Sequence, residues 1–282
     1  MKMKLQLLLL SIFIFPVICT TNSFANSLTD TTLLAENTVS ESSNEMTIYI
    51  PSNVIFPSSL ESNREQSVAY IKKYIENNKG FLTNMYKQGK KVFPKVNAIL
   101  KRYGLPEEFR VLIALESGFN GNAFSRAGAV GYWQMMDEVA IEYGLKILSA
   151  NDKLEGLLKK DERSNFSKST AAAARYLRDR CKNLNDNVLL IVAAYNWGIG
   201  NIRNVMRKTG KSNPTFWDIK KMLPAETRNY VMNFITLNVI FKNFDKFSKN
   251  TLVFEPKAVR VAHSEKISTE PAFISQTMTL ED

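Results

Sequence analysis

"LPEEFRVLIALESGFNGNAFSRAGAVGYWQ", residues 105–134, places one carboxylate, Glu116, inside an otherwise apolar run. The apolar residues Phe109, Leu112 and Ile113 precede it by seven, four and three positions. On a helix these spacings bring Glu116 onto the same face as the apolar residues. The pattern therefore predicts a helix over residues 107–117 whose core-facing stripe includes an ionisable group.

A carboxyl group at this position has two interpretations. If it is buried, the loss of hydration disfavours its charged form and raises its pKa, which suits a general acid working near neutral pH. Alternatively, Gly118 ends the helix, and Glu116 at the frayed end reaches solvent or a lysine. The helix alone leaves both interpretations open.

Two further segments carry side chains suited to a sugar-binding cleft. Small and polar residues dominate "SGFNGNAFSRAGAVGYWQMM", so its backbone can approach a ligand closely. Tyr132 and Trp133 in that segment offer flat rings for stacking on sugars, although core packing is the favoured interpretation of Trp133. "AAYNWGIGNI" places Tyr195 and Asn196 at a helix end before a glycine-rich turn, where a cleft lining and a plain helix connection explain them equally well.

The N-terminus has the layout of a secretory signal peptide. Two lysines precede an apolar run over residues 5–18, and "SFA" ends at Ala25 with small residues at its first and third positions. The run is shorter than the roughly 20 residues of a membrane-spanning helix, which disfavours a permanent anchor. Lipid anchoring at Cys19 is disfavoured because Ile18, not a small residue, precedes it. We expect export to the periplasm or cell envelope of a bacterium, with Cys181 then the only cysteine and no intramolecular disulfide.

The charge balance is basic. The chain has 37 Lys and Arg against 27 Asp and Glu, a net charge of +10, and removing Lys2 and Lys4 with the signal leaves 35 minus 27, or +8. A basic exported protein suits an anionic polymer as its partner. Nucleic acid is disfavoured because the basic residues are dispersed along the chain and no nucleic-acid motif is present. The only histidine, His263, lies in the polar C-terminal tail, which excludes His-based triads and most zinc sites.

Hydrophobic periodicity predicts a mainly α fold. The 282 residues are 45% hydrophobic, enough for one sizeable core, and strand patterns are almost absent between the helical segments. We therefore expect a compact globular helical domain with extended N- and C-terminal segments. Beyond residues 107–117, helices are predicted at 170–181, 187–195, 200–208 and 227–244.

Four sequence blocks resemble a known enzyme family. "ALESGFNGNAFSRAGAVGYWQMM", "AAYNWGIGNI" and "LPAETRNYV" resemble, in order and spacing, the three signature blocks of the soluble-lytic-transglycosylase (SLT) catalytic domain, which is related to goose-type lysozyme. "DERSNFSKSTAAAARYL" resembles the connecting block of the membrane-bound lytic murein transglycosylase D subgroup. The similarity covers about residues 105–240 and implies a lysozyme-like helical domain with a cleft.

The sequence patterns and the resemblance together imply a domain division. Residues 1–25 would be the signal peptide, 26–62 a linker with a short β-like arm in "MTIYIPSNVIF", 63–104 N-terminal helices packing on the next domain, 105–249 the transglycosylase catalytic domain, and 250–282 a C-terminal tail.

The resemblance also implies roles for individual residues. Glu116 would be the single catalytic acid and base, and Ser117 would be structural. The residues implied to line the cleft and bind substrate are Ser125, Gln134, Met136, Tyr195, Asn196, Glu226 and Tyr230. Tyr132 replaces a leucine of the family pattern, "MMDEVA" lacks the usual proline, and Trp197 stands where a small residue is common, so the shape of the subsites is where departures are expected.

The implied reaction needs neither metal nor organic cofactor. Glu116 would protonate the β-1,4 glycosidic oxygen between N-acetylmuramic acid and N-acetylglucosamine, and then take the C6 hydroxyl proton to close a 1,6-anhydro ring. The implied partner is the peptidoglycan glycan strand, acted on by a monomer, with cell-wall or secretion-machinery proteins as further partners. The alternatives are a lysozyme-type hydrolase that uses water and a noncatalytic peptidoglycan-binding protein.

Overall fold

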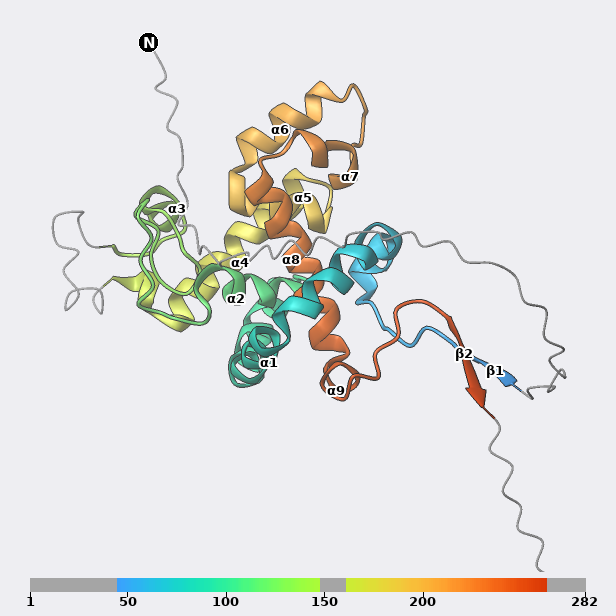
Figure 1. Ribbon diagram of the computed structural model, residues 1–282. Helices are drawn as coiled ribbons and strands as arrows, with labels where there is room; N and C mark the ends of the chain where they lie inside the picture. Colours follow the sequence, from blue (N-terminus) through green and yellow to red (C-terminus); the bar gives the residue numbers. More distant parts are fainter. Residues whose placement is uncertain (1–44, 148–160, 263–282) are drawn as a thin grey trace, which may run out of the picture. The chain divides into compact units, whose positions relative to one another are not determined.

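The computed structural model of the protein describes residues 45–147 and 161–262, which fall into two units. The first unit runs from Asn53 to Phe254 and contains all the described helices, and the second contains the described residues on either side of it. Helices dominate the regular structure (Figure 1), so the predicted mainly α fold is confirmed. The predicted signal peptide, Cys19 and His263 lie outside the described residues.

Side-chain caps start several of the helices. Asn165 accepts a hydrogen bond from the Lys168 N–H, so α4 begins at residue 166, ahead of the predicted start at 170. Asn187 caps α5 in the same way through the Leu190 N–H. The helical elements of the first unit are η1 (Ser58–Asn63), α1 (Arg64–Arg102), η2 (Glu107–Val111), α2 (Leu112–Ser117), α3 (Asp137–Glu142), η5 (Glu162–Ser164), α4 (Phe166–Asn183), α5 (Val188–Trp197), α6 (Ile199–Lys208), α7 (Phe216–Ile219), η6 (Lys220–Met222), α8 (Ala225–Lys242) and α9 (Phe244–Ser248).

The helix predicted over residues 107–117 is divided into two parts. Its first five residues form the 3₁₀ helix η2, and α2 then continues to Ser117. Such tighter turns are common at helix N-termini, and here Phe109 and Val111 are buried within the turn. Because α2 still ends at Ser117, Glu116 keeps its place on the face predicted for it.

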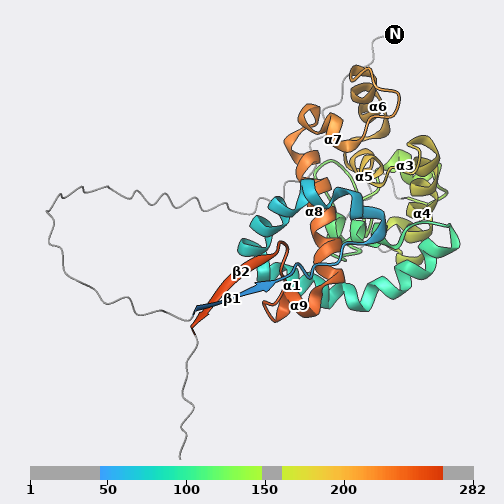
Figure 2. The same cartoon turned by 90° about the vertical axis from the view of Figure 1, so that its right-hand side faces the viewer.

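The first unit is packed around α8. Every residue of α8 from Phe234 to Phe241 is buried, as expected of a helix that is apolar around most of its circumference. Two polar residues in this stretch bond to the helix itself: Thr236 to the Met232 carbonyl at 2.8 Å and Asn238 to the Phe234 carbonyl at 3.0 Å. Helices α1, α2 and α5 contact α8, which Figures 1 and 2 show running between them. The helix therefore provides a common wall for the residues around Glu116.

The first and last strands of the described residues pair with each other. In the second unit, β1 (Glu45–Ile50) and β2 (Lys257–Ala262) form an antiparallel two-stranded sheet. The strand β1 covers the first part of the expected β-like arm and ends at Ile50, just before Pro51, and its partner β2 lies in the expected C-terminal tail. At the ends of the first unit, the Asn53 N–H donates to the Val253 carbonyl and the Val253 N–H donates to Asn53 Oδ1, both at 2.9 Å. Across the described residues, no helix combines the length and apolarity needed to cross a membrane.

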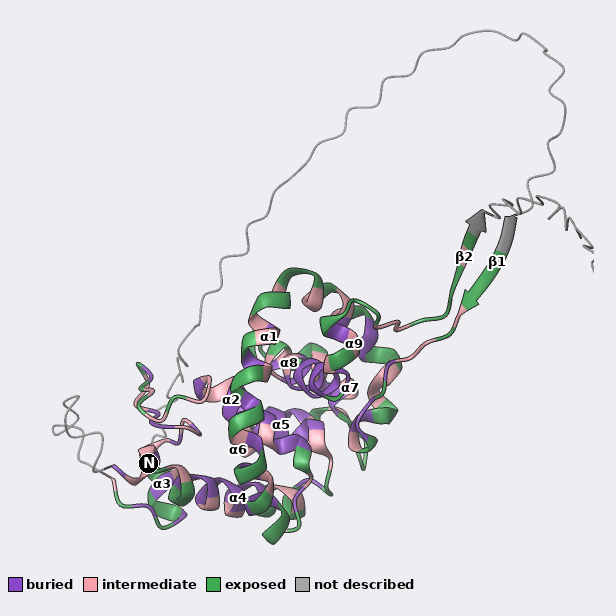
Figure 3. Cartoon of the chain, turned by 90° about the horizontal axis from the view of Figure 1, so that it is seen from below, coloured by how far each residue is buried: buried purple, intermediate pink, exposed green. Residues whose placement is uncertain are grey.

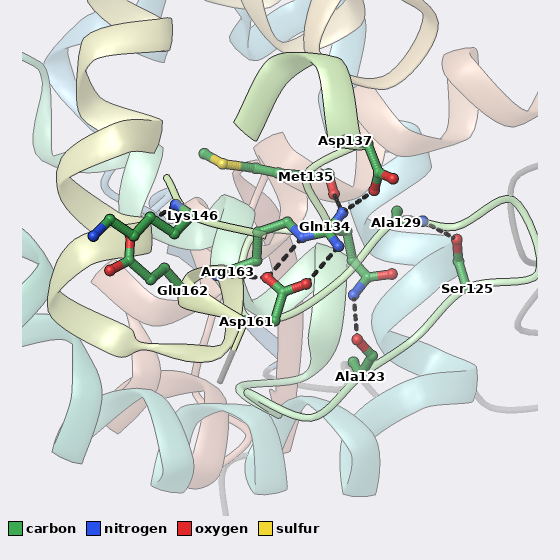
Figure 4. A network of polar contacts seen from close by, with 10 residues as sticks. All are labelled: Ala123, Ser125, Ala129, Gln134, Met135, Asp137, Lys146, Asp161, Glu162 and Arg163. Carbon is green, nitrogen blue, oxygen red and sulfur yellow. Dashed lines mark hydrogen bonds and ion pairs between the residues drawn. The ribbon is translucent and has the colours of Figure 1, made fainter. Parts of the chain in front are cut away.

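A buried ion cluster holds the loop over residues 118–136 that follows α2. Arg163 is fully buried and pairs with Asp161 at 2.6 Å and with Asp137 at 2.5 Å. Its guanidinium also donates to the Met135 carbonyl at 3.2 Å (Figure 4). Removing one partner of such a cluster would leave an uncompensated charge away from water, so the pairing is strongly maintained. The end of the loop is thereby tied to the segment that precedes α4.

Gly131 is the place where this loop passes closest to Arg163. Its φ is +82°, in the left-handed region, and a Cβ atom added there would lie 2.0 Å from the Arg163 carbonyl oxygen. A larger residue would have to move the backbone of the loop, of Arg163, or of both. Glycine at position 131 is therefore required by conformation and by space together.

We expect Gly131→Ala to lower the free energy of unfolding by about 2 to 4 kcal/mol, because it combines a left-handed strain with a backbone clash. Urea unfolding followed by circular dichroism measures the change. Gly80→Ala is the matched control, since Gly80 lies in α1 with no atom within 4 Å of an added Cβ, and we expect it to be neutral or to stabilise by up to about 1 kcal/mol. Equal unfolding midpoints for the two variants would contradict the close approach at Gly131.

Candidate active site

Glu116 lies in the last turn of α2. Gly118 ends that helix in the left-handed conformation, with φ +57° and its N–H donating to the Ala114 carbonyl. The side chain of Glu116 is nevertheless half-buried, and the residues that share its face, Leu112 and Ile113, are fully buried. Gly118 therefore stops the helix as the sequence suggested, while Glu116 remains turned into the protein.

The partner of Glu116 comes from α8. The Tyr230 hydroxyl donates a short hydrogen bond to Glu116 Oε1, across 114 positions of sequence. Burial raises the pKa of both the Glu116 carboxyl and the Tyr230 phenol, the latter well above 10. Tyr230 is consequently a neutral donor at all ordinary pH values.

Burial raises the pKa of Glu116 to about 8. The hydrogen bond from Tyr230 opposes this by favouring the carboxylate, and the nearby negative charge of Glu226 adds to the increase. At neutral pH most Glu116 side chains therefore hold a proton. Because Tyr230 occupies Oε1, that proton is available on Oε2, and the group can act as an acid and afterwards as a base.

A second tyrosine reaches the loop beside Glu116. The Tyr195 hydroxyl, at the end of α5, donates to the Trp133 carbonyl at 2.7 Å. Burial raises its pKa well above 10, and the charge of Glu116 raises it further, which places the two side chains in one electrostatic environment. Tyr195 thus connects α5 to the loop in the neighbourhood of the carboxyl group.

The loop over residues 118–136 is held by its own polar side chains. Ser125 is 2% exposed and its hydroxyl accepts the Ala129 N–H at 2.9 Å. The Gln134 amide donates to the Ala123 carbonyl at 3.1 Å (Figure 4) and to the Gly131 carbonyl at 2.9 Å. These bonds shape the loop. They use the side-chain nitrogen of Gln134 and not its side-chain carbonyl oxygen.

Comparison with known proteins identifies a family domain within the sequence. Residues 95–217 match the family model described as the transglycosylase SLT domain. These residues are an SLT domain. The chain is 30% identical over 187 residues to the membrane-bound lytic murein transglycosylase D of Escherichia coli strain K12, covering 65% of this chain and 38% of that protein. It is 28% identical over 155 residues to the membrane-bound lytic murein transglycosylase F of Actinobacillus pleuropneumoniae serotype 7, covering 50% of this chain and 29% of that protein.

The matched relatives are longer than this chain's region of similarity, which spans well under half of each. Among solved structures, the 70 kDa soluble lytic transglycosylase of Escherichia coli is 24% identical, with a TM-score of 0.40 over 56% of this chain and 25% of that one. The match of residues 95–217 to the SLT domain agrees with the resemblance found in the sequence blocks.

Not every residue expected in the SLT site contacts Glu116. Asn196 is buried and its side-chain oxygen accepts the Thr227 hydroxyl at 2.8 Å, joining α5 to α8. Met136 is half-buried and precedes the first residue of α3, and Glu226 is exposed in the first turn of α8. Glu226 nevertheless acts on Glu116 through its charge.

Two aromatic residues of the SLT loop have structural roles. Trp133 is fully buried and its indole N–H donates to Thr170 Oγ1 at 3.0 Å, so the favoured core interpretation is right and stacking on sugar is excluded. Tyr132 is half-buried and meets Phe166 edge to face, with ring centroids 5.3 Å apart. Ser117, expected to be structural, donates to the Tyr132 carbonyl at 2.8 Å.

Tyr176 in α4 is a site residue that sequence reasoning missed. Its ring lies edge to face with Tyr195 at 5.4 Å between centroids and with Tyr143 at 5.6 Å. The Arg180 guanidinium covers another part of the ring at 4.5 Å. Tyr176 therefore packs against the ring of Tyr195 and helps to fix its position. Its position three residues after the buried Ala173 was a signal that could have placed it on the inner face of α4.

We expect Glu116→Gln to be more stable than the wild type, by an amount that grows with pH. The wild-type pKa rises on folding from its ordinary value of 4.5 to about 8, so the folded state binds more protons than the unfolded state within that window. Wild-type stability attributable to Glu116 must then fall as pH rises through the window, whereas glutamine does not titrate. The difference should reach about 1 to 3 kcal/mol near pH 8, measured by urea unfolding across this range. Parallel pH curves for the two proteins would contradict it, and Glu138→Gln controls for removing an exposed carboxylate.

Tyr230→Phe and Glu226→Gln should shift the pKa of Glu116 in opposite directions. The first removes a donor that favours the carboxylate and raises the pKa, while the second removes a like charge and lowers it. Carbon-13 NMR titration of the labelled Glu116 carboxyl measures both shifts. Tyr49→Phe, at an exposed tyrosine of the other unit, should leave the titration unchanged. Shifts of the same sign in the two site variants would show that the contacts around Glu116 are wrongly assigned.

Proposed function

We propose that this protein is a peptidoglycan lytic transglycosylase that cleaves the β-1,4 bond between N-acetylmuramic acid and N-acetylglucosamine. The observation that supports this proposal most directly is Glu116, whose pKa of about 8 leaves it protonated at neutral pH beside a neutral tyrosine donor. The SLT match over residues 95–217 supplies the substrate class, since the relatives are named for action on murein.

One acid–base group is sufficient for this reaction. Glu116 gives its proton to the glycosidic oxygen as the bond to the muramic acid C1 breaks, and the substrate's own N-acetyl group stabilises the developing cation. The Glu116 carboxylate then takes the proton of the C6 hydroxyl, whose oxygen bonds to C1 and closes a 1,6-anhydro ring. The proton balance closes on Glu116 itself, without water, metal or organic cofactor. Ordinary glycosidases instead divide these tasks between two carboxylates.

The other site residues would position the carboxyl group and the substrate. Tyr230 keeps Oε1 occupied, which directs the catalytic proton to Oε2. The hydrogen bond from Tyr195 to the Trp133 carbonyl would keep the loop in a fixed position beside Glu116. We assign substrate contacts to the more accessible Gln134, Met136 and Glu226, with the Gln134 carbonyl oxygen accepting from a sugar hydroxyl and Glu226 maintaining the high pKa of Glu116. The buried Ser125 and Asn196 would act indirectly, by shaping the loop and by joining α5 to α8.

The signal-like N-terminus and basic charge agree with an enzyme exported to the bacterial envelope, where its substrate lies. We propose that it acts there as a monomer on glycan strands, alongside proteins of the cell wall or of a secretion machine. The D and F relatives are named as membrane-bound, whereas we propose signal cleavage without lipid anchoring at Cys19 for this chain.

We expect Glu116→Gln to reduce the release of 1,6-anhydromuropeptides from purified sacculi by about a hundredfold or more, because the acid and base are lost together. Liquid chromatography with mass spectrometry measures the products. Glu138→Gln, at an exposed carboxylate on α3, should retain wild-type release.

The same product analysis separates the alternatives. Products one water heavier, with reducing ends, would identify a lysozyme-type hydrolase and overturn the transglycosylase reaction. Binding to sacculi with no soluble products from the wild type would identify a noncatalytic wall-binding protein. Undiminished anhydro products from Glu116→Gln would remove Glu116 from the mechanism.

A further inference from the structure

Seven basic side chains that are spread along the sequence of α1 lie on one side of that helix in the folded protein. From residue 79 to residue 102, α1 contains no aspartate or glutamate, and all its cationic side chains are exposed. With about 100° between successive residues, they occupy roughly half of the helix circumference, and the buried apolar residues occupy the other half. This surface, the α1 cationic face, consists of Lys79, Lys87, Lys90, Lys91, Lys95, Lys101 and Arg102.

The α1 cationic face is long and turned away from the core. Asn78 has a non-helical backbone, so the segment that follows runs as a helix of its own for about 36 Å. Its buried side packs toward α8, which leaves the opposite side to solvent, as the exposed colouring of α1 in Figure 3 shows. The face is therefore a linear array of positive charge on a rigid element.

The fold does not neutralise this array. Lys87, Lys91 and Lys95 follow one another at four-residue spacing, where like charges repel and lower helix stability. Neither these three nor Lys90 and Lys101 form an ion pair with any residue in 45–147 or 161–262. A repulsive arrangement without internal anions indicates that the compensating anions belong to a partner.

Two adjoining cavities extend the array onto α4. A cavity of about 400 Å³ is lined by Arg102, Tyr103 and Lys168, among others, and Tyr103 also borders a second cavity of about 710 Å³. The cations that line the second cavity, Arg175, Arg178 and Lys182, outnumber its two carboxylates, Glu142 and Asp179. Two lining lysines have internal partners, since Lys168 pairs with Glu162 at 2.5 Å and Lys182 lies 4.0 Å from Asp179, so the excess of positive charge comes from the arginines. The positive surface thus continues from a convex helix into hollows.

The shape and composition of this surface discriminate between anionic partners. Of the large hydrophobic side chains exposed in the described residues, none lies on α1, so the surface offers nothing to insert into a bilayer. A flat membrane also cannot follow the surface into the cavities, and the face has no exposed aromatic ring on which nucleic-acid bases could stack. A flexible chain with discrete carboxylates can lie along the helix and enter both hollows.

We propose that the α1 cationic face and the two cavities bind the carboxylates of the peptide stems that branch from peptidoglycan strands. The identity of the polymer rests on the proposed function, while the carboxylate chemistry rests on the surface itself. This surface is separate from the Glu116 site, and it would hold the wall polymer while the glycan is processed elsewhere on the domain. Its contribution is affinity for the polymer, with no part in bond cleavage.

The test compares two triple variants in the noncleaving Glu116→Gln background. Lys90→Gln/Lys91→Gln/Lys95→Gln removes the middle of the face, and Lys221→Gln/Lys242→Gln/Lys249→Gln removes three exposed lysines elsewhere with the same change in net charge. Co-sedimentation with sacculi at low salt should show about tenfold weaker binding for the first triple and nearly unchanged binding for the second. Equal losses in the two triples would mean that only net charge matters and would overturn the proposal.

Chemical and lipid controls test the ligand. Amidating the free carboxyl groups of the sacculi should lower binding of the parent protein at least to the level of the first triple, and should weaken binding of that triple by a smaller factor, because it keeps the rest of the surface. Arg178→Gln/Lys182→Gln should also weaken binding to untreated sacculi, and an unchanged affinity would remove the cavities from the site. Binding that is insensitive to amidation, or a loss seen only on phosphatidylglycerol vesicles, would overturn the peptide-stem proposal in favour of another anion or a membrane.

Turnover separates this inference from the proposed function. With Glu116 restored, Lys90→Gln/Lys91→Gln/Lys95→Gln should process short glycans that lack peptide stems at the wild-type rate. If the wild type releases no anhydro products yet binds sacculi through their carboxylates, the proposed function fails and the binding surface stands. If the wild type is active and the first triple binds sacculi like the second, the binding surface fails alone.

Discussion

The hydrogen bond from Tyr230 to Glu116 joins α2 to α8, and the chemistry of the site depends on it. A buried carboxyl group without a cationic partner is costly in its charged form, so it holds its proton into the neutral range. The bond fixes which oxygen carries that proton, and the packing of α8 against α1, α2 and α5 keeps the donor in place. A shift of α8 would therefore change both the orientation and the pKa of the Glu116 carboxyl group.

The protein treats its two buried charged sites in opposite ways. Arg163 is surrounded by Asp161, Asp137 and a backbone carbonyl, so it remains an ion and serves as a rigid anchor for the loop. Glu116 faces a neutral phenol and the like charge of Glu226, so its carboxyl group keeps a proton that it can give up near neutral pH. The first arrangement suits structure and the second suits proton transfer, and the loop over residues 118–136 connects them.

Positive charge and catalysis occupy different elements of the SLT domain. The α1 cationic face is generated by a helix whose inner side is committed to the core, which forces its seven cations outward together. The proposed active site instead draws on the ends of α2 and α5 and the first turns of α8. A long polymer could engage both because its branches and its backbone are chemically different, with carboxylates on the first and glycosidic bonds in the second.

The sequence by itself determined the longer helices and the helix face on which Glu116 lies. Those properties depend on spacings of a few residues: the apolar positions before Glu116, Gly118 after it, and the caps at Asn165 and Asn187, all of which act within one or two helical turns. Tertiary structure alone decided that Tyr230 meets Glu116 and that Tyr176 supports Tyr195. It also decided that the side chains of Ser125 and Gln134 form hydrogen bonds within their own loop and that β1 pairs with β2. These contacts join residues that are far apart in the sequence, and they depend on how the helices pack and how the loop closes. The periodicity along a single helix specifies neither the packing nor the loop closure. The same limit explains the lysines of α1, which look scattered along the chain and become one surface only when the helix commits its other side to the core.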